Sequence, residues 1–133
     1  MLIGVVGKPS AGKSTFFNAA TSQDVPMANY PFTTIEANKA MGFVRVECVD
    51  KEFDTQCNPR TGFCKNHIRY VPVEMIDVAG LVPGAHEGKG KGNQFLSDLS
   101  RADVLIHVVD VSGSTNEKGE PVPMGSHDPG KDV

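Results

Sequence analysis

The sequence predicts an α/β domain in which a mostly parallel sheet lies between two layers of helices. Three observations predict it. A glycine-rich loop joins an apolar run to a helical segment at the N-terminus, apolar runs then alternate with helical segments, and the run over residues 104–109 is continuously apolar. Alternating strands and helices are typical of parallel sheets. A continuously apolar run is typical of a strand covered on both faces, so residues 104–109 are expected to be a buried parallel strand.

The other elements follow from local patterns. Strands are expected over residues 2–6, 41–49, 68–76 and 104–109, and helices over residues 15–21 and 93–102. In the first helix, Phe16, Phe17 and Ala20 are expected on one face, as the helical period suggests. Residues 25–34 contain two prolines and residues 79–92 contain five glycines, so both segments are expected to be loops.

Composition limits the possible functions. A chain of 133 residues suits one domain, and its 13 basic and 16 acidic residues give no basic excess, so no direct DNA binding is expected. No segment approaches 18 apolar residues, and the N-terminal apolar run is too short for a signal peptide, so no membrane association is expected. These features indicate a cytoplasmic protein whose three cysteines are reduced.

The glycine-rich loop has the pattern G-x-x-x-x-G-K-[ST] over residues 7–14. Such a loop, the P-loop, directs backbone N–H groups at a phosphate, while its lysine reaches the β- and γ-phosphates and its hydroxyl faces Mg²⁺. The pattern predicts a P-loop nucleoside-triphosphatase fold rather than an ordinary glycine-rich turn. The residues expected at the nucleotide are Gly7, Lys8, Pro9, Ser10, Ala11, Gly12, Lys13, Ser14 and Thr15.

Two further patterns point to a sensor of the γ-phosphate. Asp77-Val78-Ala79-Gly80 follows the strand over residues 68–76; its aspartate would meet Mg²⁺, through water, and the Gly80 N–H would meet the γ-phosphate. In the loop after the first helix, Thr33 or Thr34 could complete the Mg²⁺ shell, and its position in the pattern favours Thr34. The alternatives are a plain strand-to-loop turn and a proline-bearing surface loop.

These patterns resemble a known family. The P-loop, the segment Tyr30-Pro31-Phe32-Thr33-Thr34-Ile35-Glu36 and the segment from Asp77 to Ala85 are similar to those of the Obg-like translation-factor GTPases. Within that family the resemblance is to the YchF subfamily, also called Obg-like ATPases, in its archaeal form. It implies a three-layer G domain, Mg²⁺-dependent hydrolysis of GTP or ATP, and association with ribosomes.

The resemblance also implies a domain organisation. Residues 1–133 would be the N-terminal part of an OBG-type G domain, with an inserted hairpin around residues 48–69. The base-recognition pattern N-K-x-D does not occur, since Asn116-Glu117-Lys118-Gly119 does not fit it. The helical and TGS domains of the family are not present in this sequence either. The choice between GTP and ATP therefore stays open, with GTP favoured by the archaeal form.

The hydrolytic machinery departs from the commonest pattern. Leu81 stands where many GTPases place a water-orienting glutamine. Slow intrinsic turnover is therefore expected, with Lys13 stabilising the transition state and the water-positioning residue unknown. His86 and His127 are weak candidates for that role, and the interpretation of both as exposed loop histidines without a role is favoured. Ser10 replaces the asparagine of potassium-activated relatives, so potassium stimulation is not expected.

Cysteines raise a separate question. Cys48, Cys57 and Cys64, with His67 close behind, could form a tetrahedral zinc site. The gaps of eight and six residues between the cysteines do not match the usual C-x₂₋₄-C spacing, which favours reduced thiols in an inserted hairpin.

Function is predicted as a Mg²⁺-dependent nucleotide-hydrolysing switch linked to translation. Two alternatives remain. One is a nucleotide-binding module with little hydrolysis, and the other, less consistent with Asp77–Gly80 and Thr34, is a small-molecule kinase.

Overall fold

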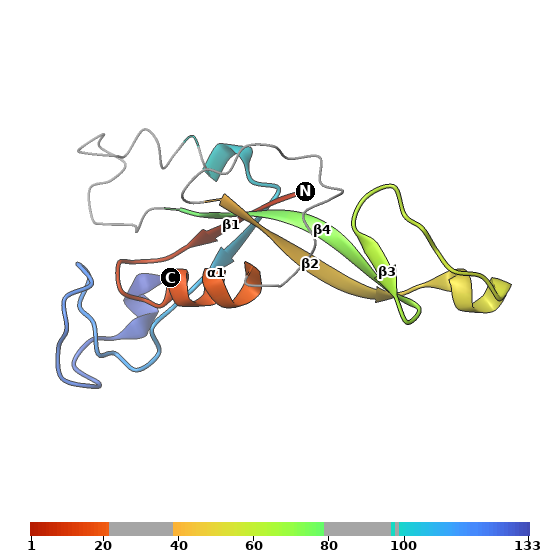
Figure 1. Ribbon diagram of the computed structural model, residues 1–133. Helices are drawn as coiled ribbons and strands as arrows, with labels where there is room; N and C mark the ends of the chain where they lie inside the picture. Colours follow the sequence, from red (N-terminus) through yellow and green to blue (C-terminus); the bar gives the residue numbers. More distant parts are fainter. Residues whose placement is uncertain (22–38, 79–96, 98) are drawn as a thin grey trace.

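The computed structural model describes residues 1–21, 39–78, 97 and 99–133 (Figure 1). A five-stranded sheet forms its centre, in the order β2-β4-β1-β5, with β3 paired to β4. The strands are β1 (Leu2–Val6), β2 (Lys39–Glu47), β3 (Phe63–Lys65), β4 (Ile68–Asp77) and β5 (Val104–His107). Among the described helices, none is long and apolar enough to cross a membrane.

The sheet is mixed, and three of its five strands are parallel. β1 pairs in parallel with both β4 and β5, whereas β2 and β3 run antiparallel to β4. Parallel neighbours need a crossover connection, usually a helix. Residues 48–67, which join β2 to β4, contain only the 3₁₀ helix η2 (Val49–Phe53) and β3, so β4 returns antiparallel to β2. The predicted α/β fold with a mostly parallel sheet is confirmed.

Helical segments cover the two faces of the sheet, which gives three layers (Figure 1). On one face, Phe17 of α1 (Lys13–Thr21) packs with Val5, Val73 and Met75. On the other face, Leu99 packs against a cluster of Val6, Ile76 and Val78. Full burial of a side chain such as Phe17 stabilises the fold by roughly 1.5–3 kcal/mol. The two clusters hold β1 and β4, and with them the loops at their carboxyl ends, in place.

Two expectations about burial were wrong. Phe16 is 39% exposed while Phe17 is buried, because successive side chains on a helix point in directions about 100° apart and only one of them faces the sheet. The strand at residues 104–107 is parallel as predicted but not buried, since Val104 and Leu105 are 47% and 50% exposed. Its apolar character therefore does not reflect burial: β5 is the last strand of the described sheet and pairs only with β1 there.

The connection from β2 to β4 forms an extension at one end of the sheet (Figure 1). β2 begins and ends two residues earlier than predicted, because Cys48 already leads into η2. β3 and β4 are joined by Asn66 and His67, whose φ angles are +52° and +60°. Two positive φ angles are what a type I′ turn requires, and this turn matches the twist of a tight hairpin.

Aromatic side chains brace this extension. The rings of Phe63 and Tyr70 stack with their centroids 4.4 Å apart, and Phe43 meets Phe63 edge-on at 5.6 Å. The guanidinium of Arg45 lies 5.6 Å from the centre of the Tyr70 ring. These contacts join β2, β3 and β4, so the short β3 is held by side-chain packing as well as by its ladder.

Candidate functional site

The P-loop lies between β1 and α1, at the carboxyl end of the parallel strands. Gly7 is needed there for close packing, because a Cβ atom at this position would lie 2.4 Å from the carbonyl oxygen of Val108. Ser10 has a left-handed backbone conformation, with φ of +61°. This end of an open α/β sheet is where ligands of such folds bind.

Lys13 and Ser14 begin α1 directly after the loop. The Lys13 ammonium is buried and donates a hydrogen bond of 2.9 Å to the carbonyl oxygen of Lys8. Burial lowers the pKa of Lys13, and the nearby Asp77 carboxylate opposes this effect. The lysine is therefore held against the loop backbone that the sequence predicts to surround a phosphate.

Ser14 and Asp77 meet across the site. β1 and β4 pair with Val5 opposite Asp77, which places the aspartate beside the start of α1. The Ser14 hydroxyl donates a hydrogen bond of 2.8 Å to Asp77 Oδ2. A hydroxyl and a carboxylate so close together are oxygen donors of the kind that Mg²⁺ prefers. The residues present thus fit the predicted cation.

Several other residues considered for the site lie outside the described residues. They are Thr33, Thr34, Gly80, Leu81 and His86. Of the predicted set, the structure brings together the P-loop, Lys13, Ser14 and Asp77.

Residues 110–133 form a tail that packs on the P-loop, a contact that sequence reasoning missed. The buried Lys8 ammonium donates a hydrogen bond of 2.8 Å to the Thr115 carbonyl oxygen and forms an ion pair of 2.7 Å with Asp132. The Lys8 side chain is thus engaged by the tail, which leaves its backbone to contribute to the loop. The tail is rich in glycine, proline and charged residues, and this composition gave no signal of the pairing. The partners lie more than 100 residues apart in the sequence.

His127, the second weak candidate for positioning water, belongs to the same network. Its Nε2 lies 2.9 Å from Asp132 Oδ1, so Asp132 bridges His127 and Lys8. Burial alone would raise the pKa of Asp132, but the bonds to Lys8 and His127 outweigh it and the pKa is lowered. One nitrogen of the His127 ring is therefore occupied within the tail.

Asp110 organises the start of the tail. Its carboxylate accepts hydrogen bonds from the hydroxyls of Ser112, Ser114 and Thr115 and from the Ser112 N–H. The hydroxyl of Ser112, then that of Thr115, contribute most to lowering the pKa of Asp110. Because Thr115 also holds Lys8, this turn fixes the part of the tail that touches the P-loop.

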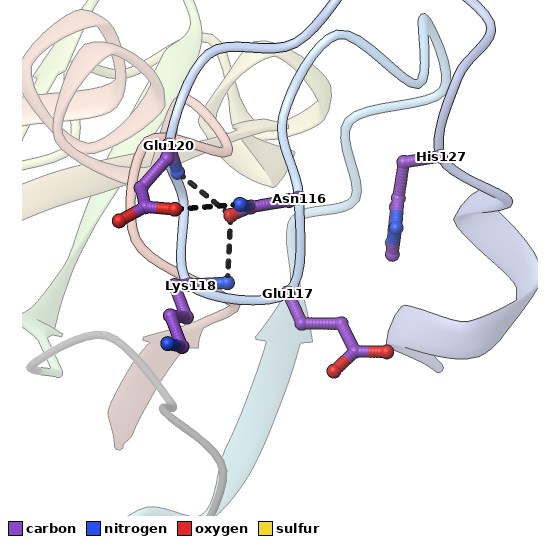
Figure 2. A pocket seen from close by; sticks show the side chains of 5 residues that line it. All are labelled: Asn116, Glu117, Lys118, Glu120 and His127. Atoms are coloured by element: carbon purple, nitrogen blue, oxygen red, sulfur yellow. Dashed lines mark hydrogen bonds between the residues drawn. The ribbon is translucent and has the colours of Figure 1, made fainter.

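A pocket of about 230 Å³ lies in the tail, and Figure 2 shows its lining. The lining residues are Asn116, Glu117, Lys118, Glu120 and His127. The turn that carries the first four of them packs on the P-loop, because a Cβ atom at Gly119 would lie 2.4 Å from the Pro9 carbonyl oxygen. Only glycine allows this approach at a φ of +80°.

Both polar atoms of the Asn116 side chain make hydrogen bonds inside its own turn (Figure 2). Its Oδ1 accepts hydrogen bonds from the N–H groups of Lys118 and Glu120, and its Nδ2 donates one of 2.7 Å to the Glu120 carboxylate. This agrees with the mismatch between residues 116–119 and the N-K-x-D pattern.

A second group of reactive side chains lies in the extension. The Sγ atoms of Cys48, Cys57 and Cys64 all lie within 4.8 Å of one another, although they come from the end of β2, a loop and β3. All three thiols are free and half-buried. Burial, followed by the neighbouring Cys48, raises the pKa of Cys57 and raises that of Cys64 to about 12.

Asp50 lies at the centre of this group, a role that sequence reasoning missed. It is 4% exposed. Its Oδ2 accepts a hydrogen bond of 2.8 Å from the Cys57 N–H and lies 3.6 Å from Cys64 Sγ, and its Oδ1 lies 2.9 Å from His67 Nδ1. The Cys57 N–H is the main reason that the pKa of Asp50 is lowered to about 2. An acidic residue two positions after the first cysteine was the only sequence signal.

Comparison with known proteins identifies the family. The model of the family described as 50S ribosome-binding GTPase matches residues 2–127. The chain belongs to this family.

Individual members of this GTPase family are also similar. The chain is 54% identical to an uncharacterized GTP-binding protein of Methanocaldococcus jannaschii, over 99% of the chain and 33% of that relative. It is 44% identical to the ribosome-binding ATPase YchF of Mycoplasma genitalium, over 80% of the chain and 27% of the relative. The chain thus spans about a third or less of the curated relatives it matches.

A solved structure supports the fold. The crystal structure of a GTP-binding protein from Pyrococcus horikoshii matches with a TM-score of 0.69 and 37% identity, over 99% of this chain and 29% of that one. The predicted relation to Obg-like and YchF proteins is confirmed by these relatives.

Proposed function

We propose that the protein is a Mg²⁺-dependent nucleoside triphosphatase that works as a switch linked to translation. The observation that carries this is the meeting of Ser14 and Asp77, 2.8 Å apart, beside Lys13 at the mouth of the P-loop. A P-loop enzyme needs a backbone cradle, a lysine and oxygen donors for the cation. The loop after β1, the start of α1 and the end of β4 contribute these groups.

The proposed reaction is hydrolysis of the bond between the β- and γ-phosphates. Water attacks the γ-phosphorus, the bridging oxygen leaves with the nucleoside diphosphate, and inorganic phosphate is released. Backbone N–H groups of residues 7–14 and the Lys13 ammonium stabilise the charge on the phosphate oxygens. Ser14 and Asp77 would hold Mg²⁺, with Thr34 as the third proposed contact; when bound, the cation neutralises charge on the β- and γ-phosphates. Thr15, Thr33 and Gly80 complete the proposed nucleotide site.

Lys13 is suited to this role by its environment. Its ammonium is buried against the Lys8 carbonyl oxygen, so little side-chain freedom remains to be lost when it contacts a phosphate. A phosphate would supply the negative charge that the buried ammonium lacks on that side, and this would offset the lowering of its pKa by burial.

GTP is the proposed nucleotide in preference to ATP. The archaeal relative is named as GTP-binding and the bacterial one as an ATPase, so their names alone do not decide between the two nucleotides. The higher identity to the archaeal relative favours GTP. Competition of ATP and GTP for one fluorescent nucleotide on the full-length protein, with and without Mg²⁺, tests this. At least tenfold tighter binding of GTP is expected, and equal or reversed affinity would refute it.

Ribosome association in the cytoplasm is the proposed setting. It is supported by the description of the family as 50S ribosome-binding GTPase and by the name of the bacterial relative, a ribosome-binding ATPase. Sedimentation of the full-length protein with ribosomes, in the presence of a non-hydrolysable GTP analogue or of GDP, tests it. More protein in the ribosome fraction with the analogue is expected, and none in either state would count against the proposal.

A second candidate is a module that signals by nucleotide occupancy with little hydrolysis. Leu81, which cannot orient water by a hydrogen bond, favours it. Single-turnover hydrolysis separates the two, since a rate no faster than that of Lys13→Ala supports the second candidate. His86→Ala and His127→Ala, measured in the same assay, identify which histidine, if either, positions the water.

A further inference from the structure

The three cysteines gather at the end of the sheet away from the P-loop. η2 and β3 extend beyond the domain at the amino end of β4, whereas Asp77 lies at its carboxyl end (Figure 1). Nothing in the proposed nucleotide reaction uses these thiols. The chain has no other cysteine, so all three converge at one place.

Their separation is close to what a tetrahedral ion demands. Thiolates bind Zn²⁺ at about 2.3 Å, which places two of them roughly 3.8 Å apart. The three Sγ atoms already lie within 4.8 Å of one another, so movements of about 1 Å would bring them onto one ion. Among the described residues, no histidine nitrogen belongs to this group of candidate ligand atoms. His67, which the sequence suggested as a fourth ligand, directs its Nδ1 to Asp50 instead.

Surrounding contacts hold the trio in place before any ion arrives. Asp50 fixes the backbone at Cys57 and lies against Cys64 Sγ. The Cys48 N–H donates a hydrogen bond of 2.8 Å to the His67 carbonyl oxygen, which ties the end of β2 to the β3–β4 turn. Preorganised ligands with hydrogen-bonded outer partners are typical of protein metal sites.

We propose that Cys48, Cys57 and Cys64 bind one zinc ion through three thiolates, with the fourth position left to water. The three thiols lose their protons to solvent, three zinc–sulfur bonds form, and no redox change takes place. Sulfur ligands select a thiophilic ion such as Zn²⁺ over Mg²⁺, which takes oxygen. The ion clamps β2, the loop after η2 and β3 together. It replaces the core that this narrow extension cannot form.

The test is metal binding by the full-length protein purified in reductant. Elemental analysis is expected to find about one zinc per chain, or the chelator-stripped protein to take one up. Cobalt(II), used as a spectroscopic probe, is expected to give thiolate charge-transfer bands and intense tetrahedral d–d bands. Cys48→Ser, Cys57→Ser and Cys64→Ser should each weaken zinc binding by more than the roughly 10–100-fold typical of outer-shell changes.

His107→Ala is the matched control. It removes a metal-binding side chain from the exposed strand β5 and should leave zinc content unchanged. Absence of zinc after purification together with no cobalt bands on titration would overturn the proposal. So would full zinc retention in the three serine variants, or a disulfide between two of these cysteines in metal-loaded protein. Because the stripped wild-type chain can be reloaded, serine variants that fail to fold leave the cobalt titration decisive.

Discussion

The two ends of β4 carry two candidate sites that are built in opposite ways. At the carboxyl end, Asp77 meets a P-loop whose residues are contiguous in the sequence. At the amino end, Ile68 follows a turn beside three cysteines that come from three separate segments. Ten strand residues separate the two ends by about 30 Å, so the sites share a strand but no contact. The contiguous loop gives a clear pattern in the sequence, whereas the spacing of the dispersed cysteines argued against a site and only the fold shows that they meet.

The largest effect is expected from Lys13→Ala, which tests whether the two ends of β4 act independently. Lys13→Ala removes the ammonium that is held against the P-loop backbone, and nucleotide affinity is expected to fall on the order of 100-fold or more. Zinc content is expected not to change, because the extension lies at the other end of β4. Isothermal titration with GTP and elemental analysis of the same sample check both statements. Loss of both ligands together would show that the two ends are coupled.

Asp50→Asn tests the amino end. Asparagine keeps the shape of Asp50 but replaces a carboxylate oxygen, so zinc affinity is expected to fall roughly 10–100-fold. Chelator competition measures this, with Glu52→Gln on the exposed side of η2 as the matched control. Unchanged zinc affinity would mean that Asp50 stabilises the loop without positioning the thiols.

Lys8→Met addresses the tail that covers the P-loop. It removes the Lys8 ammonium from the buried Asp132 and leaves His127 as the described partner of that carboxylate, which is expected to destabilise the protein by about 2–3 kcal/mol. Urea unfolding measures the change. Lys131→Met, in the short 3₁₀ helix η4 (Pro129–Asp132), is the control and should have little effect. A double change of Lys8→Met and Asp132→Leu should recover much of the loss; no recovery would show that Lys8 acts mainly through Thr115.

The smallest effect is expected for the pH dependence of stability that Asp110 contributes. Its pKa is lowered in the folded state, so its contribution to stability is present above the ordinary value of about 4 and is lost as pH falls through the folded value. Wild type should therefore exceed Asp110→Asn in unfolding free energy at pH 7, and the difference should shrink below about pH 4. A difference that stays constant with pH would assign the effect to shape rather than charge.

Sequence reasoning grouped Lys13, Ser14 and Asp77 because the signals around them are local. The P-loop pattern and the strands before it and before Asp77 are short-range features, and the structure brings Lys13, Ser14 and Asp77 together. It failed where distant residues decide the outcome. The exposure of Val104 depends on the position of β5 at the edge of the described sheet. The pairing of Lys8 with Asp132 depends on the path of the tail.

The proximity of the three cysteines was also not predictable from the sequence. Spacing favoured unligated thiols, because gaps of eight and six residues do not form a local metal-binding loop. η2 turns the chain between Cys48 and Cys57, and the pairing of β3 with the start of β4 returns Cys64 to the end of the sheet where β2 also ends. Proximity in this case follows from β3 pairing beside β4, which no spacing rule contains.

The turn residue His67 has a consequence for protein engineering. At a φ of +60° a histidine backbone is less favourable than glycine, by roughly 1–2 kcal/mol. Yet its ring is the partner of Asp50, so the same position that strains the backbone also steadies a buried carboxylate. Hairpin rules would recommend glycine at this position to relieve the backbone. His67→Gly would also remove the ring that contacts Asp50, so the substitution would lose part of the stability that it is meant to add. Consensus turn design is a poor guide wherever a loop residue also serves the interior.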